Sequence, residues 1–261
     1  MKNLSFKNTV ISYTDTGKGN AVVLLHGFLE SKLMWQSLIP HLSKRFRVIS
    51  IDLLGHGESE CYGYIHSMED QADMVYHVIS ELRLRKISIV GHSMGGYVAL
   101  AFAELYPDLL RSLILLNSST LPDSDERKIN RDRAIEVVKK NSTAFIKMAT
   151  HHLFTKEIHE NFKEEISFFT EQALKTSLQG IIASLEGMKI RIDREALLHF
   201  SPYPKLVIAS SNDTIIPIEE VENQVKNTDV IFEKVPGGHV STIEQLTTIS
   251  TIIFNFLRKN G

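Results

Sequence analysis

Cysteine is almost absent from this sequence, and with it any disulfide scaffold. Cys61 is the single cysteine among 261 residues, so no intrachain disulfide can form. Long apolar runs are also missing, because no window approaches the roughly 20 residues that a helix needs to span a bilayer. The first eight residues contain no apolar segment of signal-peptide length. We therefore expect a cytoplasmic protein that does not enter a membrane.

An excess of charge of either sign is missing as well. The formal net charge is -2, which gives no electrostatic attraction to nucleic acid or to an anionic membrane surface. The apolar fraction of 43% and the charged fraction of 23% are ordinary for a soluble globular enzyme. The length fits one large α/β domain, or a domain with a sizeable insertion.

Short apolar runs that alternate with amphipathic stretches predict a doubly wound, mostly parallel sheet. Residues 4–13 alternate in a strand-like way, and 21–25 is a continuous apolar run of the kind found in strands covered on both faces. Further strands are expected at 46–51, 87–90 and 113–116. Helices are expected at 33–42, from 68 to 82 and from the Gly-rich turn near residue 93 to about 106. Ser67, with an acidic residue three positions later, forms a capping box for the second of these helices.

The alternation stops between residues 122 and 199, where no strand is evident. Charged helical stretches are expected there instead, at 125–140, 143–153 and 157–185. Strands resume at 205–209 and 230–235, and a final amphipathic helix follows. We therefore predict a core formed by residues 1–121 and 200–261, with a helical lid inserted at 122–199.

A Gly-x-Ser-x-Gly turn lies between a strand-like run and a helix-like run. Residues 91–95 read Gly-His-Ser-Met-Gly, directly after the apolar segment 87–90. The glycines let the chain turn sharply, which would hold Ser93 at the tip of the sheet. A nucleophile elbow requires this strand–turn–helix context, so Ser93 is the predicted nucleophile.

A serine hydroxyl is a poor nucleophile at neutral pH and needs a general base that a carboxylate orients. Of the eleven histidines, His239 follows the last predicted strand on a Pro-Gly-Gly turn, and Asp213 lies just after the strand before it. Both belong to the carboxyl edge of the sheet, where sites form in open α/β sheets. The other position for an acid, after the strand 113–116, holds Asn117. We predict that Asp213 orients His239, which activates Ser93.

The tetrahedral intermediate of acyl transfer needs hydrogen-bond donors for its oxyanion. The backbone N–H of Met94, directly after the nucleophile, is the first predicted donor. The second should come from the loop after the strand 21–25, and we assign it to the N–H of Phe28.

These motifs together resemble the α/β-hydrolase superfamily over nearly the whole chain. The matching segments are His26-Gly27-Phe28, Asp52-Leu53-Leu54-Gly55-His56-Gly57-Glu58-Ser59, Gly91-His92-Ser93-Met94-Gly95, Asn212-Asp213 with Pro217, and Gly238-His239. The resemblance implies an eight-stranded, mostly parallel sheet with a helical lid after the sixth strand. It also implies a hydrolase that uses neither a metal ion nor an organic cofactor. The segment 187–194 is similar to small bacterial carboxylesterases and enol-lactonase-like members.

The residue at the elbow narrows the chemistry. Haloalkane dehalogenases and epoxide hydrolases of this superfamily use an aspartate there, whereas this chain has Ser93. We therefore predict cleavage of a small or medium carboxylic ester, with lactones and thioesters as further substrates. A carbon–carbon bond hydrolase and a menaquinone-pathway synthase-like lyase, which use the same triad, are the alternatives. Relatives of the synthase tend to place an arginine after the elbow glycines, where this chain has Tyr97. A non-enzymatic ligand receptor of the same fold is the third interpretation.

Three further histidines belong to the motifs. We expect His26 and His56 to brace loops through hydrogen bonds rather than to take part in catalysis. His92 precedes the nucleophile, but its side chain leaves the turn in another direction, so we expect it to serve in packing.

Overall fold

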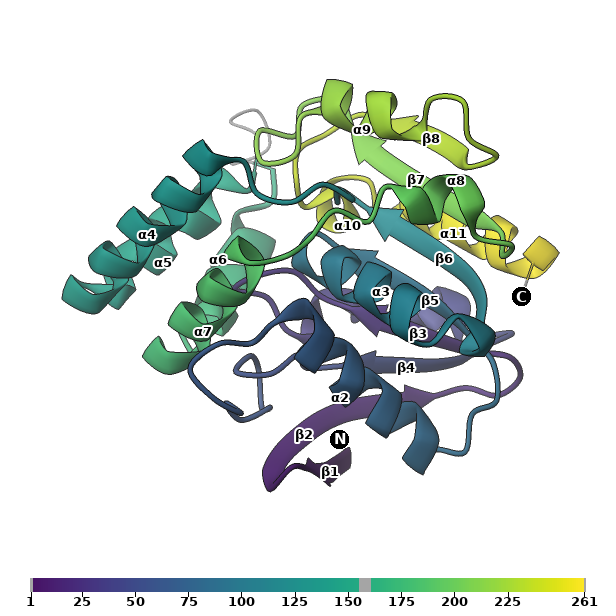
Figure 1. The fold of residues 1–261 in the computed structure, drawn as a ribbon, viewed down its shortest axis with the longest axis horizontal. Coiled ribbons are helices and arrows are strands. Elements are labelled where there is room, and N and C mark those ends of the chain that lie inside the picture. Colours follow the sequence, from purple (N-terminus) through teal and green to yellow (C-terminus); the bar gives the residue numbers. More distant parts are fainter. Residues whose placement is uncertain (1, 155–160, 261) are drawn as a thin grey trace.

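The computed structural model describes residues 2–154 and 161–260. Within these residues eight strands form one sheet, as the motifs implied: β1 (Lys2–Phe6), β2 (Thr9–Thr16), β3 (Ala21–Leu25), β4 (Arg47–Ile51), β5 (Ile87–His92), β6 (Leu110–Leu116), β7 (Lys205–Ser210) and β8 (Ile231–Val235). Their order across the sheet is β1-β2-β4-β3-β5-β6-β7-β8 (Figure 1). Along this order, the six strands β4-β3-β5-β6-β7-β8 pair in parallel with one another. Strand β2 pairs antiparallel with both β1 and β4.

The predicted strand at 4–13 is wrong in one respect, because this segment is a hairpin that joins β1 to β2. Lys7 and Asn8 form its turn with φ angles of 47° and 64°. A two-residue turn with positive φ at both positions matches the right-handed twist of the flanking strands. Lysine carries no turn signal, which is why the alternation read as a single strand.

The sheet has helices on both faces (Figure 1). The outer elements that flank it are η1 (Lys32–Trp35), α1 (Ile39–Leu42), α2 (Met68–Glu81), α3 (Met94–Leu105), η2 (Pro107–Leu109), α9 (Ile218–Val225), α10 (Ser241–Glu244) and α11 (Leu246–Asn260). Apolar side chains of α2, α3 and α9 belong to one buried cluster, and those of α1 and α11 belong to another. Within β3, Val23 contributes to the first cluster and Val22 to the second. Both faces of β3 are therefore buried, as its unbroken apolar run predicted.

The described residues between β6 and β7 contain helices and no strand. These helices are α4 (Asp125–Lys140), α5 (Ser142–His152), α6 (Lys163–Ala173), α7 (Leu178–Lys189) and α8 (Ala196–Phe200). The predicted helix at 157–185 is wrong, because α6 and α7 are separate helices and Ser177 caps the second by accepting from the N–H of Gly180. The residues 157–160 of that prediction lie outside the described residues. Figure 1 shows α4 to α7 beyond the arrowhead ends of the strands. The lid limits at 122 and 199 stay a prediction.

A buried ion cluster ties the start of this insertion to its end. Asp123, just after β6, accepts hydrogen bonds from Arg131 of α4 and from Nη1 of Arg191 after α7, the latter at 2.5 Å. Arg191 also donates to the carbonyl oxygen of Leu121, and the N–H of Arg194 donates to the carbonyl oxygen of Thr120. The two connections between the sheet and the inserted helices are therefore bonded to each other.

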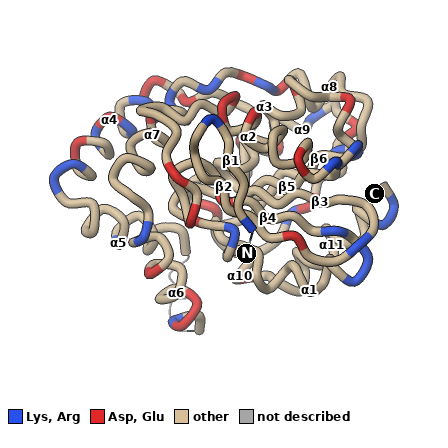
Figure 2. Tube along the Cα trace, turned by 90° about the horizontal axis from the view of Figure 1, so that it is seen from below, with Lys and Arg blue, Asp and Glu red and all other residues tan. Residues whose placement is uncertain are grey.

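Lysine and arginine alternate with aspartate and glutamate along the surface, as Figure 2 shows for α4. In the part of the chain that the structure describes, none of the helices has the length and apolar character that crossing a membrane requires.

Candidate active site

The turn between β5 and α3 holds Ser93 in a strained backbone conformation. Its φ and ψ are 50° and -117°, in a region that residues with a side chain rarely adopt. The conformation is fixed from three sides. The N–H of Ser93 donates to the carbonyl oxygen of Leu116 in β6, and its own carbonyl oxygen accepts from Ser118 Oγ at 2.8 Å and from the N–H of Gly96. These bonds place Ser93 at the carboxyl edge of the sheet.

Glycine is required at both ends of the turn. A Cβ atom at Gly91 would lie less than 3.0 Å from the carbonyl oxygen of Gly95. A Cβ atom at Gly95 would in turn lie that close to the carbonyl oxygen of Leu25, at the end of β3. Two backbone segments and a helix start therefore meet here at distances that exclude any side chain.

The structure brings the three predicted side chains together. Nε2 of His239 lies 2.9 Å from Oγ of Ser93, and Nδ1 of His239 lies 2.7 Å from Oδ2 of Asp213. All three residues are buried, and Ser93 is the most accessible of them at 9% exposure. Within hydrogen-bond reach, a base therefore faces the serine and a carboxylate faces the base, which is the geometry that nucleophilic catalysis needs.

Asp213 is held as a carboxylate. Burial alone would raise its pKa, but the charge of His239 and the hydrogen bonds from His239 and two backbone N–H groups hold the pKa below its usual value. Those N–H groups belong to Ile215 and Ile216, and both donate to Oδ1. The amide of Asn117 donates to Oδ2. From the sequence, position 117 was notable only for the absence of an acid. Its position at the carboxyl end of β6, beside β7, was the signal that could have identified it as a partner of the acid.

The two predicted oxyanion donors leave neighbouring strands at the same edge. Phe28 follows β3 and Met94 is the first residue of α3 after β5, and these strands pair in parallel with Leu25 opposite Gly91. This pairing brings the loop after β3 next to the elbow, although the roles of the two N–H groups stay a prediction.

His26 and His56 brace the adjoining loops, as predicted. His26 donates from Nδ1 to the carbonyl oxygen of Gly27 and accepts at Nε2 from the N–H of Leu53. His56 contacts the carbonyl oxygen of Leu54. Burial lowers the pKa of His56 to about 3, so this ring is neutral.

The packing role expected for His92 is too simple. Both ring nitrogens of His92 are hydrogen bonded, one to Glu30 at 3.0 Å and the other to the backbone carbonyl oxygen of His239 at 2.9 Å. No motif marked Glu30, because it stands in the loop after β3 without a periodic or compositional signal.

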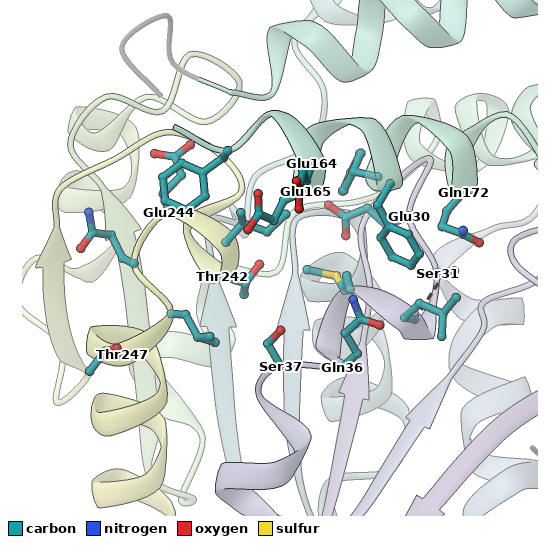
Figure 3. Close-up of a pocket in the computed structure, with 18 of the residues that line it drawn as sticks. Glu30, Ser31, Gln36, Ser37, Glu164, Glu165, Gln172, Thr242, Glu244 and Thr247 are labelled. Carbon is teal, nitrogen blue, oxygen red and sulfur yellow. Dashed lines mark hydrogen bonds between the residues drawn. The ribbon is translucent and has the colours of Figure 1, made fainter. Parts of the chain in front are cut away.

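A cavity of about 590 Å³ lies beside these residues, between η1, α6 and the α10–α11 turn (Figure 3). Four carboxylate side chains line it: Glu30, Glu164, Glu165 and Glu244. None of the described residues that line it is a lysine or an arginine. Ser93, Asp213 and His239 do not line this cavity, and its connection to them in the structure is Glu30, which bonds to His92. In residues 2–154 and 161–260, no group of three or more His, Cys, Asp or Glu side chains has the arrangement of a metal site.

The family follows from the sequence comparison as well as from the geometry. A model of the alpha/beta hydrolase fold family matches residues 20–165, which is more than half of the chain. The chain therefore belongs to the α/β-hydrolase family, and its relatives support a hydrolase.

Three known proteins show how similar the relatives are. A thermophilic esterase from Thermogutta terrifontis, solved with malate bound, is 36% identical with a TM-score of 0.92, over 96% of this chain and 94% of that one. A Bacillus subtilis protein, provisionally assigned as a 2-succinyl-6-hydroxy-2,4-cyclohexadiene-1-carboxylate synthase, is 32% identical over 91% of this chain and 90% of its own length. The enol-lactonase from Burkholderia xenovorans LB400 has a TM-score of 0.92 at 21% identity, over 98% of this chain and 100% of its own. At that identity the lactonase shows the shared fold alone.

Proposed function

We propose that this chain is a serine hydrolase that cleaves a small or medium carboxylic ester through an acyl-enzyme on Ser93. The observation that carries the proposal is the continuous hydrogen-bonded series from Ser93 Oγ through His239 to Asp213, with distances of 2.9 and 2.7 Å. The 36% identity to an esterase over almost the whole chain supports the choice of an ester. Lactones and thioesters, which present the same carbonyl carbon, are the further substrates.

The first half of the reaction forms the acyl-enzyme. Ser93 Oγ attacks the carbonyl carbon of the ester while its proton moves to Nε2 of His239. Asp213 accepts the hydrogen bond from Nδ1 and stabilises the imidazolium that results. The oxyanion lies against the N–H groups of Phe28 and Met94, and each such donor contributes about 3 kcal/mol to transition-state stabilisation. The proton on Nε2 then passes to the leaving alcohol as the bond from carbon to alcohol oxygen breaks.

In the second half of the reaction, water hydrolyses the acyl-enzyme. His239 takes a proton from a water molecule, the resulting hydroxide attacks the acyl carbon, and the proton on Nε2 returns to Ser93 Oγ as the acid departs. The proton transfers therefore balance: His239 takes one proton from Ser93 and gives one to the alcohol, then takes one from water and returns one to Ser93.

The synthase-like alternative has one relative in its favour and two structural observations against it. The carboxylate product named for the Bacillus subtilis relative calls for a cation near the nucleophile. Arg191 lies beside the elbow helix, with its guanidinium 4.1 Å from the ring centre of Tyr97. Its charge already faces Asp123, and it also donates to two backbone carbonyl oxygens. The carboxylates of the neighbouring cavity also disfavour an anion.

A fluorophosphonate probe and a panel of p-nitrophenyl esters of graded acyl length test the proposal. We expect labelling at Ser93 and turnover of the short esters, both of which Ser93→Ala abolishes. Ser88→Ala is the matched control, because Ser88 is a buried serine of β5, the strand before the elbow, and bonds to Ser112 and not to the triad. Turnover by Ser93→Ala would exclude this nucleophile, and a single turnover that leaves a stable adduct on the native chain would favour the receptor.

A further inference from the structure

His92 lies behind the nucleophile and contacts two loops at once. It is the last residue of β5 and fully buried. Its Nδ1 lies 3.0 Å from Oε2 of Glu30, in the loop after β3. Its Nε2 lies 2.9 Å from the backbone carbonyl oxygen of His239, in the loop after β8. Glu30 is buried as well, at 4% exposure.

The partners of this ring determine how many protons it carries. The carbonyl oxygen of His239 can only accept, so Nε2 of His92 must bear a hydrogen. Oε2 of Glu30 already accepts from the N–H of Gly27 at 2.5 Å, as an ionised carboxylate does. With Glu30 ionised, Nδ1 also donates to that oxygen, and His92 is then an imidazolium with two N–H groups.

We propose that Glu30 and His92 form a buried ion pair that positions the two loops around Ser93. Glu30 fixes Gly27, which directly precedes Phe28, the residue that carries the second oxyanion donor. His92 fixes the backbone of His239, which carries the base. The inference rests on the proposed function, because it assigns these two residues a positioning role in that reaction. Neither residue touches the reacting atoms.

The charged groups that face His92 agree with this state. Glu30 is the nearest anion, Asp213 is a second one, and the His239 ring lies 5.0 Å away centre to centre. Burial would lower the pKa of His92, but the charge and hydrogen bond of Glu30 hold it above its usual value. Burial would likewise raise the pKa of Glu30, but the charge of His92 and the bonds from His92 and Gly27 hold it below.

The variant Glu30→Gln tests the charge of Glu30, because glutamine has nearly the same shape without the charge. In Glu30→Gln the ring loses its counter-ion and becomes neutral, with one N–H for two acceptors. It then keeps its bond to residue 30 or to the carbonyl oxygen of His239, but not to both. We expect kcat for p-nitrophenyl acetate to fall about tenfold at pH 8.5 with KM changed less than twofold, since small displacements of catalytic groups cost rate rather than binding. The loss should be as large at pH 6, because without the charge of Glu30 burial holds the pKa of the ring below its usual value.

His92→Phe and Ser88→Ala complete the set. The phenyl ring fills the same space without donors, so we expect kcat to fall about tenfold to a hundredfold at every pH. Ser88→Ala removes a buried hydrogen bond from the other end of β5. It should lower the melting temperature and leave both kcat and its pH dependence unchanged. A Glu30→Gln enzyme with native kcat at both pH values, or one whose KM rises while kcat does not fall, would overturn the positioning role.

The protonation state is measured on the unmodified chain. In protein labelled with ¹⁵N-histidine, the His92 signals are those missing from the His92→Phe spectrum. We expect both nitrogens to carry protons at pH 8, where an exposed histidine with a pKa near 6.5 is neutral. A neutral tautomer would overturn the ion pair whatever the activity. If the native chain neither reacts with fluorophosphonate nor turns over esters, the proposed function fails, and this spectrum still decides on the pair.

Discussion

The side-chain amide of Asn117 donates to Oδ2 of Asp213 over 2.9 Å, and the same oxygen accepts the hydrogen bond from Nδ1 of His239. Oδ1 of Asp213 accepts from two backbone N–H groups. The carboxylate is thus surrounded by donors alone, and each of its oxygens has two of them. This arrangement orients the imidazole and leaves no place for a donor at residue 213.

Asp213→Asn should therefore lower kcat about 10³-fold to 10⁴-fold with little change in KM. The oxygen of the new amide faces the two backbone N–H groups, so its NH₂ group faces both Asn117 and His239. His239 then accepts at Nδ1 and carries its proton on Nε2, where it cannot take one from Ser93. Steady-state kinetics with a short ester measure the effect, and a variant of native rate would place the orienting acid elsewhere.

Gly91→Ala should destabilise the fold by about 3 kcal/mol or more and abolish labelling of Ser93. A methyl group there meets the backbone of Gly95 and Gly96, which cannot move without displacing the start of α3. Gly63→Ala is the control, because nothing lies within 4 Å of the Cβ it would add. Urea unfolding compares the two variants, and equal stabilities would mean that the turn tolerates a side chain.

Asp123→Asn should lower the free energy of unfolding by about 3 kcal/mol at pH 7, because it leaves Arg191 buried without its counter-charge. Burial would raise the pKa of Asp123, but the hydrogen bonds and charges of Arg131 and Arg191 hold it below its usual value of 3.8. A lowered pKa in the folded state contributes stability above pH 3.8 that is lost as the pH falls through the folded pKa. The difference between native chain and variant should therefore shrink below pH 3.8.

Asp125→Asn is the control for that measurement. Its carboxylate lies two residues further along the chain and is 98% exposed. Exposed ion pairs contribute little, so this variant should unfold like the native chain at every pH. A loss of equal size for both variants would contradict the role of the buried cluster.

We propose that the alcohol part of the ester occupies the cavity, and the cavity carboxylates then predict discrimination between esters of different charge. We expect 4-acetoxybenzoate to have a kcat/KM about fivefold below that of its methyl ester, because a like charge a few ångströms away costs about 1 kcal/mol in water. The fivefold difference in kcat/KM between the two esters should shrink at 1 M salt, which screens the charges. The difference should also shrink in the double variant Glu164→Gln/Glu165→Gln. A ratio that neither salt nor these substitutions change would show that the alcohol part does not pass through the cavity.

The site could be predicted from the sequence where the backbone leaves few choices. The run at 21–25 is apolar at every position because its side chains enter both buried clusters, and this identified β3 and its edge. Gly91 and Gly95 identified the elbow because any side chain there meets backbone. Once the parallel sheet was inferred, Asp213 and His239 followed from their places after β7 and β8.

Partners that depend on tertiary contact could not be predicted in this way. Glu30 and His92 are 62 positions apart and meet only because β3 and β5 are adjacent. A buried glutamate in a loop looks like an exposed one in the sequence. The break between α6 and α7 was missed for another reason, since Ser177 acts as a cap within a segment whose helical periodicity continues past it.

The triad joins residues that lie far apart in the sequence. Ser93 and His239 are 146 positions apart, and the sheet between them closes only when β6 pairs with β7 across the inserted helices. Contacts of such long range form late and slowly in folding. During synthesis on the ribosome, Ser93 is made long before the base exists. The chain can react with an ester only after β8 and the loop that follows it have been made and have docked.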